Sequence, residues 1–189
     1  MLDPTTPIAL FAEETLGTIN AKMSEGILRY GRNPVVAVVD SHQAGQPVRA
    51  VCSVDSDVPV VATVADACAL GARVLVLGTA PSGGRVPDAW LPILHDAIAR
   101  GLSIVNGMHD RLQPLLGQET GEGQWIWDIR TPLDAMPPIA MARAAALDNT
   151  RVLMVGTDMA IGKMTAGLEL TRALCQQGRD AVFLATGQT

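Results

Sequence analysis

The sequence predicts an α/β fold in which a doubly wound parallel sheet is followed by the start of a second α/β unit. Three observations lead to this prediction. Short apolar runs of strand length alternate with helix-like segments of about ten residues. Polar or glycine-rich loops follow several of these runs, and a glycine-lysine motif follows the apolar run at residues 152–155. Strands that alternate with helices form right-handed βαβ units, and such units assemble into a parallel sheet.

Five segments are expected to be strands of the first sheet. Residues 35–39 form a continuous apolar run that ends in Asp40, as in a parallel strand buried on both faces. Two helices are expected between the strands, one capped by Thr63 and one that ends before Gly101. The expected strands are residues 35–39, 58–61, 74–77, 102–105 and 125–129, and the expected helices are residues 63–70 and 88–100.

The expected organisation has two domains joined by a linker. Residues 1–135 form the N-terminal domain, residues 136–150 form a linker with Pro137 and Pro138, and residues 151–189 begin a second domain. Because two strands and one helix do not bury both faces of a sheet, we expect the second domain to be truncated or to be completed by another polypeptide. Its expected elements are strand 151–155, helix 165–177 and strand 181–185.

Composition narrows the class of protein. The 189 residues are 48% hydrophobic and 17% charged, with a net charge of −5, which argues against a nucleic-acid partner. No apolar stretch approaches the ~18 residues that span a bilayer, so no membrane partner is expected. The three cysteines lack CxxC and metal-ligand spacing and are interpreted as reduced thiols of a cytoplasmic protein without a metal site. Apolar faces of an incomplete second domain favour self-association, so a homo-oligomer is expected.

The motif that carries the most chemistry lies at residues 156–165. A strand, a glycine-rich turn, a Gly-Lys pair and a helix together form a phosphate-binding loop, whose backbone N–H groups and lysine face an anion. Two features depart from the usual pattern. Five residues separate the two glycines, and Met164 stands where a Mg²⁺-binding hydroxyl is expected. The candidate phosphate-binding residues are Gly156, Thr157, Asp158, Gly162, Lys163 and Thr165.

Two further loops follow expected strands, where ligands bind in parallel sheets. Gly83 and Gly84 would let backbone amides approach a phosphate, and Arg85 would bind it with two hydrogen bonds. A flexible βα turn is the alternative. In the next loop, His109 is a candidate general base and Asp110 its orienting partner. A pair of solvated loop residues is the alternative here.

A third loop follows the expected strand at residues 35–39. It carries His42, which is a candidate catalytic residue. The preceding Asp40 and Ser41 are also residues that cap a following helix, so a structural turn is the alternative.

Several of these motifs, in this order, resemble the DgcN-type family, formerly a family of unknown function that includes D-glutamate N-acetyltransferases. The resemblance covers almost the whole chain, and the family continues well beyond residue 189. It implies a Rossmann-like N-terminal domain followed by a P-loop NTPase-like domain. The residues that carry it are 40–45, 78–85, 106–109, 156–158, Gly162-Lys163 and 185–189.

The resemblance also implies a function, namely transfer of an acetyl group from acetyl-CoA to the amine of D-glutamate or a similar amino acid. Two looser similarities bear on the mechanism. The phosphate loop is similar to that of dethiobiotin synthetase, and the N-terminal half is similar to the CoA-binding domain of succinyl-CoA synthetases. An ATP- and Mg²⁺-dependent enzyme of the dethiobiotin synthetase type is therefore one alternative. A non-catalytic module that binds CoA or a nucleotide is another.

Overall fold

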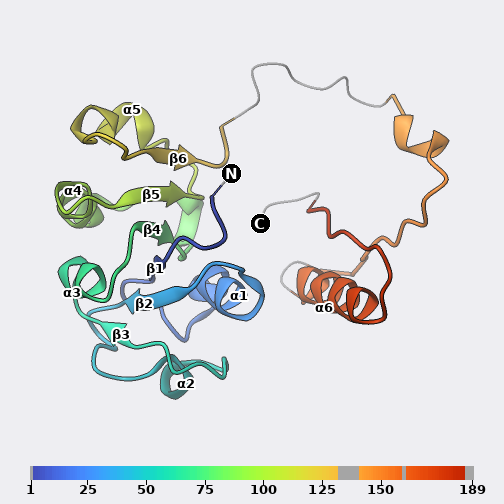
Figure 1. The fold of residues 1–189 in the computed structure, drawn as a ribbon, viewed down its shortest axis with the longest axis horizontal. Coiled ribbons are helices and arrows are strands. Elements are labelled where there is room, and N and C mark those ends of the chain that lie inside the picture. Colours follow the sequence, from blue (N-terminus) through green and yellow to red (C-terminus); the bar gives the residue numbers. More distant parts are fainter. Residues whose placement is uncertain (1, 132–140, 159–160, 186–189) are drawn as a thin grey trace. The chain divides into compact units, whose positions relative to one another are not determined.

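The structure of the chain is a computed structural model that describes residues 2–131, 141–158 and 161–185. The chain forms two compact units, Met1–Leu133 and Asp134–Thr189, which are called unit 1 and unit 2 below (Figure 1). The expected linker at residues 136–150 lies within unit 2, although residues 136–140 are outside the described residues. Each unit is described by itself.

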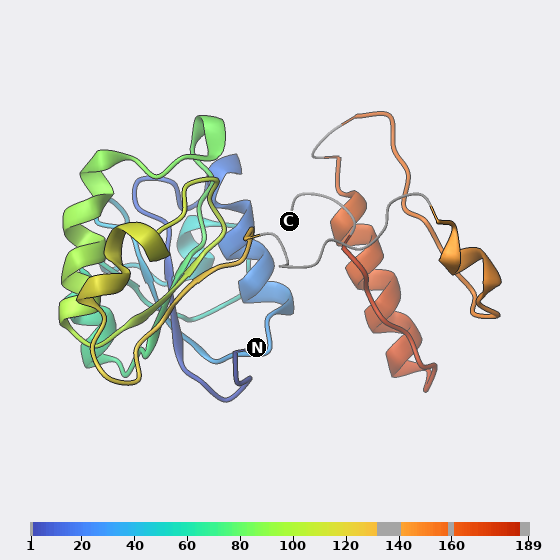
Figure 2. The same ribbon diagram turned by 90° about the horizontal axis from the view of Figure 1, so that it is seen from above.

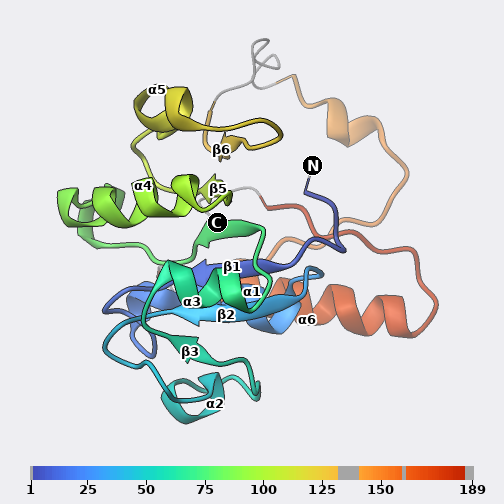
Figure 3. The ribbon, with the colours of Figure 1, turned by 60° about the vertical axis from the view of Figure 1, so that its left-hand side comes forward.

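Unit 1 is built on a six-stranded sheet in which every strand is parallel to its neighbours. The strand order is β3-β2-β1-β4-β5-β6, so chain order reverses between β1 and β4. Figure 3 shows β2 and β3 on one side of β1, and β5 and β6 on the other. This is the order of a doubly wound Rossmann fold, which binds ligands at the carboxyl ends of its strands. The strands are β1 (Ile8–Phe11), β2 (Val35–Val39), β3 (Val60–Val61), β4 (Val74–Leu77), β5 (Ser103–Asn106) and β6 (Ile126–Asp128).

Helices cover both faces of the sheet. Helices α3, α4 and α5 pack on one face and α1 on the other, as the view in Figure 2 shows. Alternate residues of each buried strand point to opposite faces of the sheet and pack into two separate hydrophobic cores. In β4, Leu75 and Leu77 face α3 and α4, whereas Val74 and Val76 face the opposite side. The helices of unit 1 are α1 (Lys22–Tyr30), α2 (Val48–Val51), α3 (Val64–Ala69), α4 (Leu91–Ala99) and α5 (Gln113–Leu116). Short 3₁₀ helices lie at Ile19–Ala21, Ser82–Gly84, Asp88–Trp90 and Gly117–Glu119.

The sequence-based prediction is confirmed for most of these elements. Strands β2 and β4 have the predicted bounds. Strand β3 begins two residues later than predicted, and β5 and β6 each differ from the prediction by one residue at both ends. Helix α3 begins after Thr63, whose side chain accepts a hydrogen bond from the Asp66 amide in a complete capping box. The predicted helix at residues 88–100 is a 3₁₀ turn followed by α4.

The N-terminal segment contains two elements that the sequence analysis did not identify, β1 and α1. Strand β1 is fully buried and hydrogen-bonded on both sides, to β2 and to β4. Its Phe11 ring meets Trp90 edge-on, with ring centroids 5.0 Å apart. The strand that holds the two halves of the sheet together therefore comes from the N-terminal residues.

Unit 2 contains a 14-residue helix, α6 (Lys163–Gln176), close to the predicted one, and a short 3₁₀ helix at Arg143–Ala146. The prediction of strands at residues 151–155 and 181–185 is wrong for this structure, because neither segment forms a strand. A parallel strand forms only with neighbours that complete its hydrogen bonds. Apolar side chains in both segments are exposed, namely Val152, Leu153, Val155, Val182 and Leu184.

None of the helices within the described ranges combines the length and apolar character needed to cross a lipid bilayer.

Candidate active site

The candidate site lies at the carboxyl ends of β4 and β5. The loop after β4 contains Gly84 and Arg85, and the loop after β5 contains His109 and Asp110. These strands are direct neighbours in the sheet, so residues about 25 positions apart in sequence are brought together.

His109 lies directly against Gly84. The His109 N–H donates to the Gly84 carbonyl over 2.8 Å, which joins the two loops through their backbones. A Cβ placed on Gly84 would lie only 2.3 Å from the His109 Cδ2 atom, and the φ of Gly84 is +65°. The positive φ favours glycine at this position, and a Cβ here would displace the imidazole. His109 is exposed, so its ring lies against Gly84 and is open to solvent.

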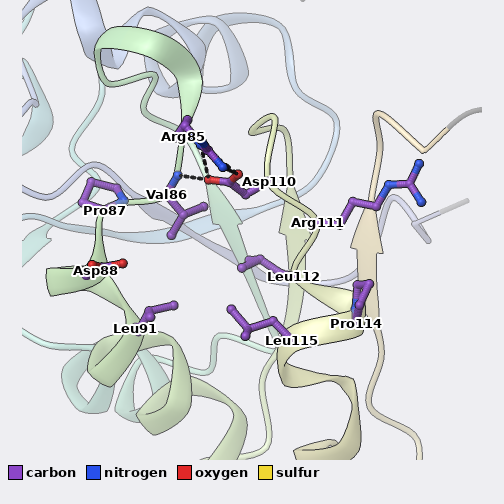
Figure 4. Close-up of a pocket in the computed structure, with 10 residues that line it drawn as sticks. All are labelled: Arg85, Val86, Pro87, Asp88, Leu91, Asp110, Arg111, Leu112, Pro114 and Leu115. Carbon is purple, nitrogen blue, oxygen red and sulfur yellow. Dashed lines mark hydrogen bonds and ion pairs between the residues drawn. The ribbon is translucent and has the colours of Figure 1, made fainter.

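Arg85 and Asp110 form a second link between the same loops. The Arg85 Nη2 and Nε atoms donate to Asp110 Oδ1 over 2.9 and 3.1 Å, and the Val86 N–H donates to Oδ2 over 2.9 Å. The hydrogen bonds from Arg85, followed by that from Val86, hold the pKa of the Asp110 carboxyl below its usual range. Figure 4 shows the two side chains meeting.

This geometry differs from the sequence-based prediction for both residues. The Asp110 carboxylate was predicted to orient His109, but within the described residues its hydrogen bonds come from Arg85 and Val86. Arg85 was predicted to bind phosphate, which stays a prediction, and in this structure its guanidinium is paired with Asp110. The physical reason is the adjacency of β4 and β5, which places opposite charges face to face. The Arg85 side chain is 78% exposed, so it remains open to solvent on its other edge.

A groove of 690 Å³ lies beside this ion pair, between the start of α4 and α5. Its apolar lining includes Val86, Leu91, Leu112 and Leu115. Figure 4 shows these side chains below the Arg85–Asp110 pair, while Arg111 extends away from the pair. The ion pair therefore borders an apolar groove, and His109 precedes Asp110 in the same loop without lining the groove itself.

Two polar side chains below these loops, Asn106 and Asp128, were not predicted as site residues. Asn106 ends β5 and Asp128 ends β6, and both are buried. The one signal in the sequence was an aspartate within the otherwise apolar segment 125–129. A buried carboxylate in a strand indicates a specific set of hydrogen bonds.

His42 lies elsewhere on the same edge, after β2. Its backbone N–H donates to Asp40 Oδ1 over 3.1 Å, which makes a turn at the strand end. Strand β2 is three positions from β5 in the sheet, a separation of roughly 14 Å at the usual strand spacing. The structure therefore does not bring His42 together with His109.

The predicted phosphate loop lies in unit 2. Gly162 has a φ of +94° and precedes α6, and the Lys163 Nζ donates to the Asp158 carbonyl. A Cβ on Gly156 would lie 2.4 Å from the Ile161 Cδ1 atom, so a larger residue there would make the Ile161 side chain move. Thr157 and Thr165 are exposed, whereas Met159 and Ala160 of the predicted loop lie outside the described residues. The lysine side chain therefore bonds within its own loop, directly before the first turn of α6.

Comparison with known proteins gives matches along most of the chain. Residues 41–132 match a family model described as "Domain of unknown function (DUF1611_N) Rossmann-like domain". Residues 138–189 match a second model, described as "Domain of unknown function (DUF1611_C) P-loop domain". The last residues that carry the resemblance in the sequence, 186–189, lie outside the described residues.

Two curated relatives bear the name D-glutamate N-acetyltransferase. The protein from Pseudoalteromonas sp is 39% identical over 129 residues, which are 67% of this chain and 38% of that protein. The protein from Tritonibacter scottomollicae is 29% identical over 187 residues, which are 97% of this chain and 53% of that protein. The chain thus spans about half the length, or less, of the curated relatives that it matches.

A solved structure agrees with the same assignment. The crystal structure of a DUF1611 family protein from Anabaena variabilis matches with a TM-score of 0.91 and 40% sequence identity. The match covers 97% of this chain and 54% of that one. With a Rossmann-like domain followed by a P-loop domain in the family's order, the chain belongs to the DUF1611 family.

Proposed function

We propose that the protein acts as an N-acetyltransferase that moves an acetyl group from acetyl-CoA to the amine of D-glutamate or a similar amino acid. The observation that carries the proposal is the name of the two curated relatives, D-glutamate N-acetyltransferase. The geometry at the end of β5 supports it, because an exposed imidazole lies there against Gly84, in the same loop as Asp110, which lines a groove. Because the chain spans part of these relatives, the proposal concerns the protein at their full length.

In the proposed reaction, the free amine of the amino acid attacks the carbonyl carbon of the acetyl thioester. The new C–N bond forms as the carbonyl electrons move onto oxygen, and collapse of this intermediate breaks the C–S bond and releases the CoA thiolate. The nitrogen attacks as the free amine, because an ammonium group has no lone pair to donate, and it must then lose one proton to become the amide nitrogen. His109 is the proposed base, and the proton that it accepts can pass to the departing thiolate.

Arg85 and Asp110 have a positioning role in this proposal. Their ion pair, together with the His109–Gly84 backbone hydrogen bond, joins the loop that carries the base to the neighbouring loop. A base held at a fixed position contributes more than a mobile one, because reacting groups must meet within a few tenths of an ångström.

The phosphate loop of unit 2 has a separate role, which is to bind phosphate groups of the donor. Lys163 and the N–H groups at the start of α6 are the proposed anion ligands, in place of the Asp158 carbonyl that Lys163 contacts here. Met164 has no oxygen to offer a Mg²⁺ ion, which favours a donor bound through its phosphates alone over a Mg²⁺-nucleotide.

A cytoplasmic location and a homo-oligomeric state are further parts of the proposal. The three cysteines, Cys52, Cys68 and Cys175, are free thiols, as expected in a reducing compartment.

The test uses the protein at the full length of its relatives, incubated with acetyl-CoA and D- or L-glutamate while free thiol is followed. We expect thiol release that depends on the amino acid and favours the D-enantiomer. His109→Gln is expected to lower kcat/KM by about 10²- to 10⁴-fold, the usual contribution of a general base. His95→Gln is the matched control, because His95 lies in α4 and pairs with Glu119.

A ligand-binding measurement separates this proposal from an ATP-dependent reaction. Acetyl-CoA is expected to raise the melting temperature of the wild-type protein, and Lys163→Met is expected to reduce that shift. Stabilisation by ATP with Mg²⁺ but not by acetyl-CoA, combined with no thiol release, would overturn the proposal.

A further inference from the structure

Two buried polar side chains face each other beneath the His109 loop. Asn106 and Asp128 are register partners at the ends of β5 and β6, and they are 0% and 8% exposed. The Asn106 Nδ2 donates to Asp128 Oδ1 over 2.8 Å. Burying polar groups costs folding free energy unless each group is hydrogen-bonded. The other hydrogen bonds of Asn106 and Asp128 therefore show which backbone groups they position.

Asn106 holds the residues on either side of His109. Its Oδ1 atom accepts from the Met108 N–H over 2.9 Å, and its Nδ2 atom also donates to the Asp110 carbonyl over 2.7 Å. The His109 N–H itself donates to the Gly84 carbonyl. The backbone of three consecutive residues, with His109 in the middle, is therefore fixed by hydrogen bonds.

Asp128 holds the end of the same loop. Its Oδ1 atom accepts from the Leu112 N–H and its Oδ2 atom from the Gln113 N–H, both over 2.9 Å. Together with the bond from Asn106, the carboxylate accepts three N–H hydrogen bonds. The Asp128 carboxylate thus connects the end of this loop to the Asn106 side chain, which is bonded to the middle of the loop.

We propose that Asn106 and Asp128 are positioning residues that fix the His109 imidazole against Gly84. The catalytic meaning of this inference rests on the proposed function, whereas the structural part does not. A buried polar pair contributes little net stability, because desolvation offsets much of what the hydrogen bonds gain. Instead, the hydrogen bonds of this pair hold the loop in a single conformation, and His109 lies in the middle of that loop.

The first test is an NMR measurement of histidine ring signals in the 189-residue chain, which has three histidines. Asp128→Asn keeps the shape of the side chain, but one carbonyl oxygen does not replace two carboxylate oxygens facing three N–H donors. We expect the ring signals of His109 to shift and those of His42 and His95 to stay in place.

Three further variants calibrate this result. Gly84→Ala places a methyl group where the imidazole lies and gives the shift of a displaced His109. Gly83→Ala is its matched control, because Gly83 also has a positive φ but has open space at its Cβ. Asp66→Asn makes the same chemical change in the capping box of α3, and it is expected to leave the His109 signals unchanged.

A measurement on the wild-type chain covers the case in which Asp128→Asn does not fold. The amide protons of Met108, Leu112 and Gln113 are expected to exchange with deuterium more slowly than that of Arg111, because each is held by Asn106 or Asp128. Exchange at these three amides as fast as at Arg111 would overturn the inference.

The second test uses the full-length enzyme and separates kcat from KM. Asp128→Asn is expected to lower kcat by about 10²-fold with a smaller change in KM, because the base is misplaced. A variant with wild-type His109 signals and a wild-type kcat would contradict the positioning role. Absence of thiol release by the wild-type enzyme would instead count against the proposed function and leave the NMR prediction to be judged by itself.

Discussion

Similar apolar sequences are buried in a strand in unit 1 and exposed without strand structure in unit 2. In β4, Leu75 and Leu77 are 0% exposed, whereas Leu153 and Val155 in unit 2 are 74% and 78% exposed. Strand β4 has β1 and β5 as hydrogen-bonded neighbours, and residues 151–155 pair with no strand in the part of the chain that the structure describes. An apolar run provides side chains that gain free energy on burial, but it forms a strand only when neighbouring strands complete its backbone hydrogen bonds.

The loops of the two units differ in the same way. In unit 1, the loops after β4 and β5 are joined to each other by the Arg85–Asp110 pair and by the backbone bond of His109. In unit 2, Lys163 bonds to the Asp158 carbonyl within its own loop. Functional geometry in unit 1 is thus set by tertiary neighbours, and in unit 2 by local backbone conformation.

The largest expected effect comes from matched leucine substitutions. Leu75→Ala is expected to lower the free energy of unfolding of unit 1 by about 2–5 kcal/mol, because it leaves a cavity in a closed core. Leu153→Ala is expected to change stability by less than about 0.5 kcal/mol, because the side chain is already exposed. Urea denaturation followed by tryptophan fluorescence and by circular dichroism measures both. Equal losses would mean that residues 151–155 are buried in solution.

A smaller effect is expected from the ion pair that joins the loops of unit 1. Asp110→Asn is expected to lower the melting temperature at pH 7. The pKa of Asp110 is lowered from its ordinary value of 3.8 in the folded protein, so the pair stabilises the fold above that pH. The stabilisation is lost as the pH falls below 3.8 and through the lowered pKa, and the two melting curves should converge there.

The control for this experiment comes from unit 2. Lys163→Met removes a bond to a backbone carbonyl, which has no proton to gain, so its effect should not follow the same acid transition. A constant difference between Asp110→Asn and wild type down to acidic pH would show that the ion pair is not what stabilises the loops.

The smallest effect expected is a difference in thiol reactivity between the units. Cys175 in α6 is exposed, whereas Cys52 and Cys68 are half-buried, and burial raises the pKa of both thiols above the ordinary value of 9.0. At pH 8 the thiolate fraction of the two unit 1 cysteines is therefore reduced, and they should react more slowly with an aromatic disulfide reagent. Cys175→Ser should remove the fast phase of the thiol reaction. A single reaction rate for all three thiols would contradict the expected difference between the units.

The strands of unit 1 with long apolar runs were predictable from sequence, and β1 was not. Residues 35–39 lie between Pro34 and Asp40, and residues 74–77 lie between Arg73 and Gly78. Thr63 is followed three residues later by Asp66, so local chemistry defines these elements. Strand β1 is as long as β4, but Glu13 and Glu14 follow it closely. Its place at the centre of the sheet depends on pairing with β2 and β4, which no local pattern contains.

The candidate site was also only partly predictable from sequence. Sequence placed His109 and Asp110 after a strand, but the partner of Asp110 depends on which strand lies beside β5. Asp128 lies 18 positions after Asp110 and reaches the same loop only because β6 pairs with β5. Residue type and strand ends could be predicted, and the pairing of side chains across strands could not.

The central position of β1 has a practical consequence for dissecting this protein. The Rossmann-like family model begins at residue 41, after both β1 and β2 have been completed. A polypeptide cut at that boundary would retain β3 and β4 but lack the two strands that stand between them. Such a fragment would possess the loops that carry Arg85 and His109 without the sheet that aligns them. Recombinant work on this domain should therefore begin upstream of Ile8, whatever boundary sequence profiles suggest.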